Sequence, residues 1–193
     1  MTELHIQTNR FLLRKPHLSD ASAIFDAYAQ DDLVVQYLVW RKHANIEATK
    51  QFVTYCIDQW TSGQSQPFVI QDRDTECVVG MIELRRTGHR VNLGYVLARS
   101  YWGKGCMTEV CAAVIEFLFS SNPPTFRIEA VCDLENIASA RVMEKLGMKR
   151  EGVLRAYMMH PNVSPMPRDV YVYSLVQDDQ RIKDIEQPAA PCR

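Results

Sequence analysis

A glycine-rich stretch stands near the middle of the sequence: Trp102-Gly103-Lys104-Gly105-Cys106-Met107-Thr108-Glu109. Apolar residues alternate before this stretch and recur at helical spacing after it, which predicts a turn from a strand into a helix. The first N–H groups of a helix lack intrahelical partners and carry partial positive charge, and glycines let a ligand approach the backbone. The stretch therefore indicates a turn that can bind phosphate.

Two well-known phosphate-binding motifs do not fit this turn. A Walker-type loop needs Ser or Thr after its Gly-Lys pair and an earlier glycine, whereas Gly105 is followed by Cys106. A dinucleotide-binding turn needs a third glycine, but Thr108 stands there, and the preceding strand alternates instead of being continuously apolar. A helix start without a ligand stays open on these residues alone.

The segments around the turn predict a mixed sheet. Strands are expected at residues 8–15, 68–70, 78–84, 91–97, 126–132, 148–154 and 169–176. Helices are expected after the caps Ser19-Asp20, Asn45, Gly105 and Asn136, with glycine ends at Gly63 and Gly147. The Thr87-Gly88 turn requires an antiparallel pair, while the strand–helix–strand unit of residues 91–132 requires a parallel one.

The composition favours one folded domain at residues 1–178 and a mobile polar tail at 179–193. The net charge of -1 gives no reason to expect direct nucleic-acid or membrane binding, and the basic run Arg85–Arg90 is interpreted as a solvated hairpin tip. The sequence shows neither an apolar run of about 20 residues nor a signal peptide, so we expect a cytoplasmic protein, monomeric or homodimeric.

The six cysteines are scattered and are interpreted as reduced packing residues. Neither a Cys-x-x-Cys pair nor a His-x-x-x-His spacing occurs, so no metal site is expected.

Several spaced motifs together resemble the GNAT acyltransferase superfamily, in its ribosomal-protein N-acetyltransferase (Rim) branch. They are the turn at 101–109, the segment 136–148, the opening 10–15, the segment 150–155 and Asp169. The resemblance implies an α+β fold: a mixed, mostly antiparallel, twisted sheet of about seven strands, splayed in the middle, with about four helices on its faces. It implies direct acetyl transfer to a primary amine, with a protein or peptide N-terminus as the leading acceptor. A small amine acceptor and a non-catalytic acyl-CoA-binding module are the alternatives.

The resemblance further implies acetyl-CoA as co-substrate. Its pyrophosphate would lie on the backbone amides of the glycine turn, and its pantetheine arm would pair like an additional strand with the strand before the turn. The residues so implied are Val96, Leu97, Ala98, Trp102, Gly103, Lys104, Gly105, Cys106, Met107, Thr108, Asn136 and Ser139.

Catalytic roles are less well marked. Many GNAT relatives place a tyrosine acid where this chain has Met143, so Ser139 becomes the candidate donor to the leaving thiolate, with Tyr95 as a second possibility that core packing also explains. Glu83 is the candidate carboxylate that takes up the proton of the amine through water. The alternative is that Glu83 only projects into solvent and has no catalytic role. Residues implied in acceptor binding are Tyr37, Trp40, Tyr95 and Tyr157.

Overall fold

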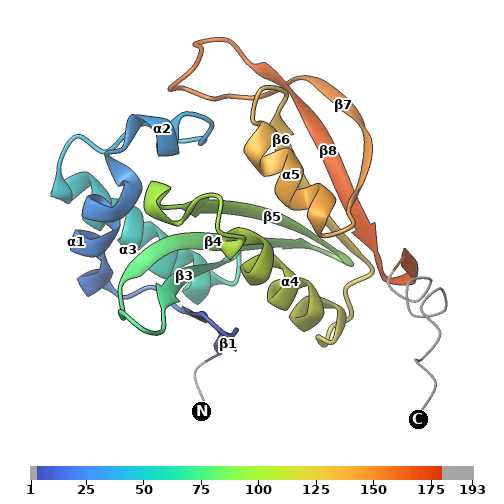
Figure 1. Ribbon diagram of the computed structural model, residues 1–193, viewed down its shortest axis with the longest axis horizontal. Helices are drawn as coiled ribbons and strands as arrows, with labels where there is room; N and C mark the ends of the chain where they lie inside the picture. The colour runs from blue at the N-terminus through green and yellow to red at the C-terminus, as the bar shows by residue number, and fades with distance from the viewer. Residues whose placement is uncertain (1–3, 180–193) are drawn as a thin grey trace.

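The computed structural model describes residues 4–179, which form one eight-stranded sheet covered by helices (Figure 1). The strand order is β1-β2-β3-β4-β5-β6-β8-β7. The strands are β1 (Ile6–Gln7), β2 (Phe11–Arg14), β3 (Gln66–Asp72), β4 (Val78–Thr87), β5 (Arg90–Leu97), β6 (Arg127–Asp133), β7 (Lys149–Met158) and β8 (Arg168–Val176). The α-helices are α1 (Ala21–Ile24), α2 (Asp32–Val35), α3 (Ile46–Ser62), α4 (Cys106–Phe119) and α5 (Ile137–Lys145).

The mixed, mostly antiparallel sheet is confirmed. Only β5 and β6 pair in parallel among the described strands; every other neighbouring pair is antiparallel. The described residues add two short elements to the expected set, β1 and α2. Both are too short for a period in the sequence to mark them.

The two faces of the sheet carry separate apolar clusters. On one face, α1 and α3 pack against Val69, Met81 and Val96. On the other, α4 and α5 pack against Ile82 and Leu93, which alternate with the first set along the strands. Each cluster therefore uses one side of the pleat, as period-two strands require.

The sheet is splayed between β5 and β6. Their pairing runs only from Arg90 opposite Arg127 to Leu93 opposite Ala130, although β5 continues to Leu97 and β6 to Asp133. Beyond Ala130, β6 keeps its pairing with β8. The inner edges of residues 94–97 and 131–133 therefore face each other unpaired, and the expected splay is confirmed.

Caps expected from the sequence hold four of the helix ends, including the C-terminal end of α5, where Gly147 has φ 77°. The side chain of Asn45 accepts from Ala48 N–H at 3.0 Å, and that of Asn136 accepts from Ser139 N–H at 3.2 Å. Gly63 ends α3 with φ 70°, in the left-handed region that favours glycine.

Asp20 stands at the N-cap position of α1, as expected, but its side chain accepts no hydrogen bond from that helix. Its buried carboxylate accepts two hydrogen bonds from the Arg14 guanidinium, at 2.9 and 2.8 Å, and one from His17 N–H at 2.7 Å. Because the charged guanidinium offers stronger hydrogen bonds than a helical N–H, Asp20 instead links β2 to the start of α1. The first long strand also starts late, at Phe11, because residues 8–10 form the turn from β1.

The interpretation of the cysteines as packing residues holds for some of them and not for others. Cys56, Cys106, Cys111 and Cys132 are buried free thiols, whereas Cys77 is exposed in a turn, so the packing interpretation is wrong for Cys77. Cys192 and residues 180–193 of the expected tail lie outside the described part of the chain.

The basic run is not a simple solvated tip. Arg85 pairs with Glu83, and half-buried Arg86 donates to Thr125 at 2.7 Å. Within residues 4–179, no helix is long and apolar enough to cross a membrane, and no cluster of three or more His, Cys, Asp or Glu side chains could hold a metal ion.

Candidate acyl-transfer site

The glycine turn presents a row of free backbone donors. Gly103 and Gly105 have φ 72° and 71°, and a Cβ at either position would meet nothing within 4 Å, so conformation and not crowding requires glycine there. Among the described residues, the N–H groups of residues 103–108 donate no hydrogen bond. They lie at the N-terminus of α4, where such donors bind anions.

Two side chains hold the turn in this orientation. The Arg10 guanidinium donates to Lys104 O at 3.2 Å and to a carboxylate oxygen of Glu109 at 2.6 Å, which ties the turn and the first turn of α4 to the β1–β2 turn. The indole N–H of Trp102 donates to Leu97 O at 2.8 Å. Because Leu97 ends β5, the turn is fixed directly beside the splayed edge.

Tyr95 and Ser139 meet on the α4–α5 side of the splay. The Tyr95 hydroxyl lies 2.7 Å from Ser139 Oγ, within hydrogen-bond distance. Burial raises the pKa of the Tyr95 phenol, so the group stays protonated and can act as the donor. Met143 is buried in the core below, so no second hydroxyl stands at its position.

Glu83 lies on the opposite face from Ser139. It sits across from Gly94 in the β4–β5 ladder and alternates with Ile82 and Leu84, which face α4 and α5. Its carboxylate accepts from Ser65 Oγ at 2.7 Å and from Arg85 at 3.0 and 2.8 Å. The structure thus places the two candidate catalytic groups on either side of the sheet, with Glu83 already engaged.

A buried ionic cluster at the end of β6 was not expected from the sequence. The fully buried Asp133 carboxylate accepts from Arg168 Nε at 2.5 Å and Nη2 at 3.0 Å, and His160 Nε2 lies 3.8 Å away. Burial raises the pKa of Asp133, but hydrogen bonds from Arg168 and from Glu135 N–H outweigh it, and the pKa lies below its usual range. Burial lowers the pKa of His160, which is therefore neutral at pH 7.

The expected acceptor-binding aromatics are only partly brought together. The Tyr37 ring packs edge-on to His160 with centroids 6.2 Å apart, so it borders the Asp133 cluster. Trp40 stacks instead on His43 and Phe52, at 4.7 and 5.6 Å. Tyr157 is 56% exposed on β7 and has no ring contact with either residue among those described.

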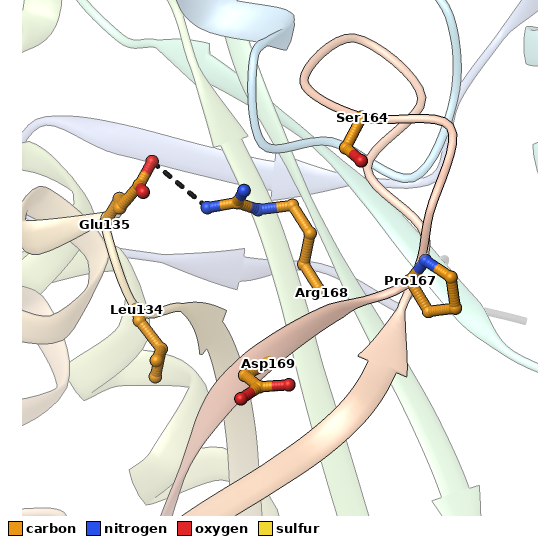
Figure 2. A pocket seen from close by; sticks show the side chains of 6 residues that line it. All are labelled: Leu134, Glu135, Ser164, Pro167, Arg168 and Asp169. Carbon is orange, nitrogen blue, oxygen red and sulfur yellow. Dashed lines mark ion pairs between the residues drawn. The ribbon is translucent and has the colours of Figure 1, made fainter.

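A cleft of about 310 Å³ lies between the end of β6 and the end of the β7–β8 loop (Figure 2). Figure 2 shows the Arg168 side chain reaching across it to Glu135, at 3.1 Å. The lining residues are Leu134, Glu135, Ser164, Pro167, Arg168 and Asp169. None was expected to bind substrate, because the cleft brings together residues about 30 positions apart in the sequence.

The Asp133 cluster gives a pH-dependent prediction. Replacing Arg168 with Met leaves a buried carboxylate without its main partner and should lower the free energy of unfolding at pH 7 by about 3 kcal/mol. In the wild type the folded pKa of Asp133 is depressed, so its stabilisation is present above the unfolded value of about 3.9 and is lost as pH falls through the folded value. In Arg168→Met burial raises that pKa instead, so the two proteins should converge as pH falls from 7 to 4 in urea denaturation.

Arg90→Met is the matched control, since Arg90 is 45% exposed and lies 3.9 Å from Glu129. It should change stability by less than about 0.5 kcal/mol. Equal losses in the two variants, or a difference that does not depend on pH, would contradict the assignment.

Comparison with known proteins identifies the family. Residues 10–149 match the family model described as an acetyltransferase (GNAT) domain. The chain is 31% identical over 175 residues to the uncharacterized N-acetyltransferase YoaA of Bacillus subtilis, covering 89% of this chain and 96% of the relative. It is 23% identical over 166 residues to the [ribosomal protein uS5]-alanine N-acetyltransferase of Escherichia coli, covering 81% and 84%.

Structural similarity agrees with the sequence match. The structure of a putative ribosomal-protein-serine acetyltransferase from Vibrio cholerae superposes with a TM-score of 0.80 at 26% identity, covering 91% of this chain and 99% of that one. These matches show that the chain belongs to the GNAT family of N-acetyltransferases.

Proposed function

We propose that the protein transfers an acetyl group from acetyl-CoA to a primary amine, with the N-terminal α-amine of a protein or peptide as acceptor. The free N–H groups of residues 103–108, fixed beside the splayed edge of β5, carry this proposal. They offer donors for a pyrophosphate and, next to them, an unpaired strand edge for an extended amide-containing arm. Acetyl-CoA has both parts in this order.

The proposed cofactor contacts follow from this geometry. The pyrophosphate would lie on the turn from Trp102 to Thr108, whose free N–H groups begin at Gly103, and the pantetheine arm along Val96, Leu97 and Ala98. Asn136 accepts a hydrogen bond through Oδ1 to cap α5, which leaves its amide N–H groups available to the arm. Ser139, one turn into the same helix, would lie near the thioester.

Transfer needs a neutral amine, stabilisation of the oxyanion and assistance for the leaving thiolate. Bound acetyl-CoA supplies a thioester, whose carbonyl carbon the amine attacks before the C–S bond breaks. The unpaired N–H groups of β5 would stabilise the oxyanion. In this proposal the Tyr95 hydroxyl donates to Ser139 Oγ, which would leave the Ser139 proton free to hydrogen-bond the departing sulfur.

An N-terminal α-amine needs less help from a catalytic base than a lysine side chain does. At cytoplasmic pH about a quarter of α-amines with pKa near 7.8 are neutral, against about a thousandth of lysine side chains with pKa near 10.4. Glu83, held by Arg85 and Ser65, would take up the released proton through water. The E. coli relative, named for an alanine of ribosomal protein uS5, supports the same acceptor class.

A lapsed, non-catalytic acyl-CoA-binding module is the second candidate. The apolar Met143, where many GNAT enzymes outside the ribosomal-protein branch have a tyrosine, and the ion-paired state of Glu83 favour it. Tight binding without turnover would distinguish this candidate from the enzyme.

The acceptor is tested with synthetic peptides. We expect the purified protein to release free CoA from acetyl-CoA in the presence of peptides that begin with Ala or Ser, at rates above the hydrolysis background. The same peptides with a blocked N-terminus but a free lysine should give no increase. Spermidine, single amino acids and an aminoglycoside complete the panel. Turnover with those small amines alone would overturn the proposed acceptor, and none at all would favour the binding module.

The cofactor turn is tested at Gly105. Gly105→Val should weaken acetyl-CoA binding by at least about tenfold in calorimetry, because a branched side chain strains a left-handed residue and covers the free donors. Gly63→Val is the matched control, since Gly63 has φ 70° with nothing within 4 Å and lies at the end of α3. It should lose stability but keep its affinity, and unchanged affinity in Gly105→Val would refute the placement of the site.

Ser139 is tested by its effect on turnover. Ser139→Ala should lower kcat by about 10- to 100-fold with little change in the KM for acetyl-CoA, because the bond to sulfur strengthens only as negative charge develops. Steady-state kinetics with the best peptide acceptor measure both constants. Wild-type kcat would remove Ser139 from the mechanism.

A further inference from the structure

Two segments far apart in the sequence meet at the open end of the splay. Asp31, the cap of α2, pairs with Arg99 at 3.0 Å, just beyond the end of β5. Six residues later, Tyr37 packs on His160, which lies 3.8 Å from Asp133 at the end of β6. Residues 31–43, hereafter the α2 segment, therefore run from the end of one splayed strand to the end of the other.

The β7–β8 loop contacts the α2 segment through His160, which packs against Tyr37, through Pro161 O, which accepts from Arg41 at 3.4 Å, and most extensively through Asn162. Asn162 Nδ2 donates to Val35 O and to Trp40 O, both at 2.8 Å, while Oδ1 accepts from Lys42 N–H at 3.3 Å. Every polar group of this amide is thus bonded to backbone about 120 or more residues away in sequence. Figure 1 shows α2 and the β7–β8 loop at the same end of the sheet.

The hydrogen bonds of Asn162 do not lie in the apolar core. Asn162 is exposed, and its partners are backbone groups of a segment outside regular structure except for α2 itself. Instead, they fix the conformation of the α2 segment. The Asn162 amide binds two carbonyls that are five residues apart in the sequence, and this determines the path of the chain between them. That path carries Tyr37, the ring that borders the Asp133 cluster.

Most ionic groups at this end are paired with one another. Asp31 and Asp133 are each paired with an arginine, and Asp32 is paired with Lys42 at 2.6 Å. Glu135 shares Arg168 with Asp133, and Asp169 accepts from Ala156 N–H at 2.7 Å. Charge as well as shape therefore bears on the acceptor, and the shape depends on where the α2 segment lies.

We propose that Asn162 is a positioning residue for the acceptor: it locks the α2 segment across the open end of the splay and so shapes the entry through which the amine reaches the thioester. The inference rests on the proposed function. Acetyl-CoA would bind on the α4–α5 face of the sheet, along the glycine turn and α5. Asn162 therefore affects binding of the acceptor and not of the cofactor.

The test separates the two substrates. Asn162→Ala should raise the KM for the best Ala- or Ser-initiated peptide by about five- to tenfold, which corresponds to about 1 kcal/mol, because the three hydrogen bonds that hold the α2 segment at the entry are lost. Its KM for acetyl-CoA and its calorimetric affinity for CoA should stay within about twofold of wild type. Asn162→Asp keeps the oxygen acceptor but sets a carboxylate against two carbonyls, and should be at least as impaired.

Asn45→Ala is the matched control because it removes an asparagine hydrogen bond from the α3 cap, away from the splay. It should lose about 1 kcal/mol of stability with no change in either KM. Amide hydrogen exchange adds a readout without an acceptor: residues 35–42 should exchange faster in Asn162→Ala, and α3 should not.

The outcomes are distinct. An active wild type whose Asn162→Ala variant keeps its peptide KM overturns the inference and leaves the proposed function standing. Wild type without transfer to any peptide overturns the proposed function, and in that case unchanged exchange at residues 35–42 in Asn162→Ala overturns the inference too. Parallel rises in both KM values would also overturn it, since they would indicate a general structural loss.

Discussion

The parting of β5 from β6 after Leu93 and Ala130 is the constraint on which the rest of the site depends. Backbone donors and acceptors at a sheet edge attract another extended chain, and proteins usually cover such edges. Here the two edges face each other in the centre of the molecule, where a long-range parallel pair ends early. The unpaired edges of this opening can pair with an extended ligand, and the glycine turn lies beside them.

The two sides of the opening are built for different tasks. On one side, α4 and α5 bring the free N–H groups of residues 103–108 and the Tyr95–Ser139 hydroxyl pair to the same edge. On the other side, the Asp31–Arg99 ion pair links the α2 segment to the end of β5, and the Tyr37–His160 contact links it to the Asp133 cluster at the end of β6. Under the proposed function, acetyl-CoA would bind on the first side and the acceptor would enter past the α2 segment, as direct transfer in a ternary complex requires.

Features determined by near neighbours could be predicted from the sequence. The side chains of Asn45 and Asn136 accept hydrogen bonds from N–H groups three residues later in the chain. The glycine turn is recognisable from the spacing of its residues. The side chain of Asp20 does not cap α1 because Arg14, six residues away, competes for its carboxylate. The Asp133–Arg168 pair and the Asn162 contacts span 35 and more than 100 residues, so no local pattern records them. The glycine turn and the helix caps were thus largely foreseeable, and the contacts between the end of β6, the β7–β8 loop and the α2 segment were not.

We propose that the turn and the splayed edge together bind acetyl-CoA. Amide NMR of the ¹⁵N-labelled protein, titrated with CoA, is the sharpest test because each backbone N–H reports separately. We expect the largest shift changes at residues 94–98 and 103–108, with smaller changes at the start of α5 and none at α3 or the outer edge of β7. Saturable binding whose largest changes lie elsewhere, or no binding at millimolar CoA, would contradict it.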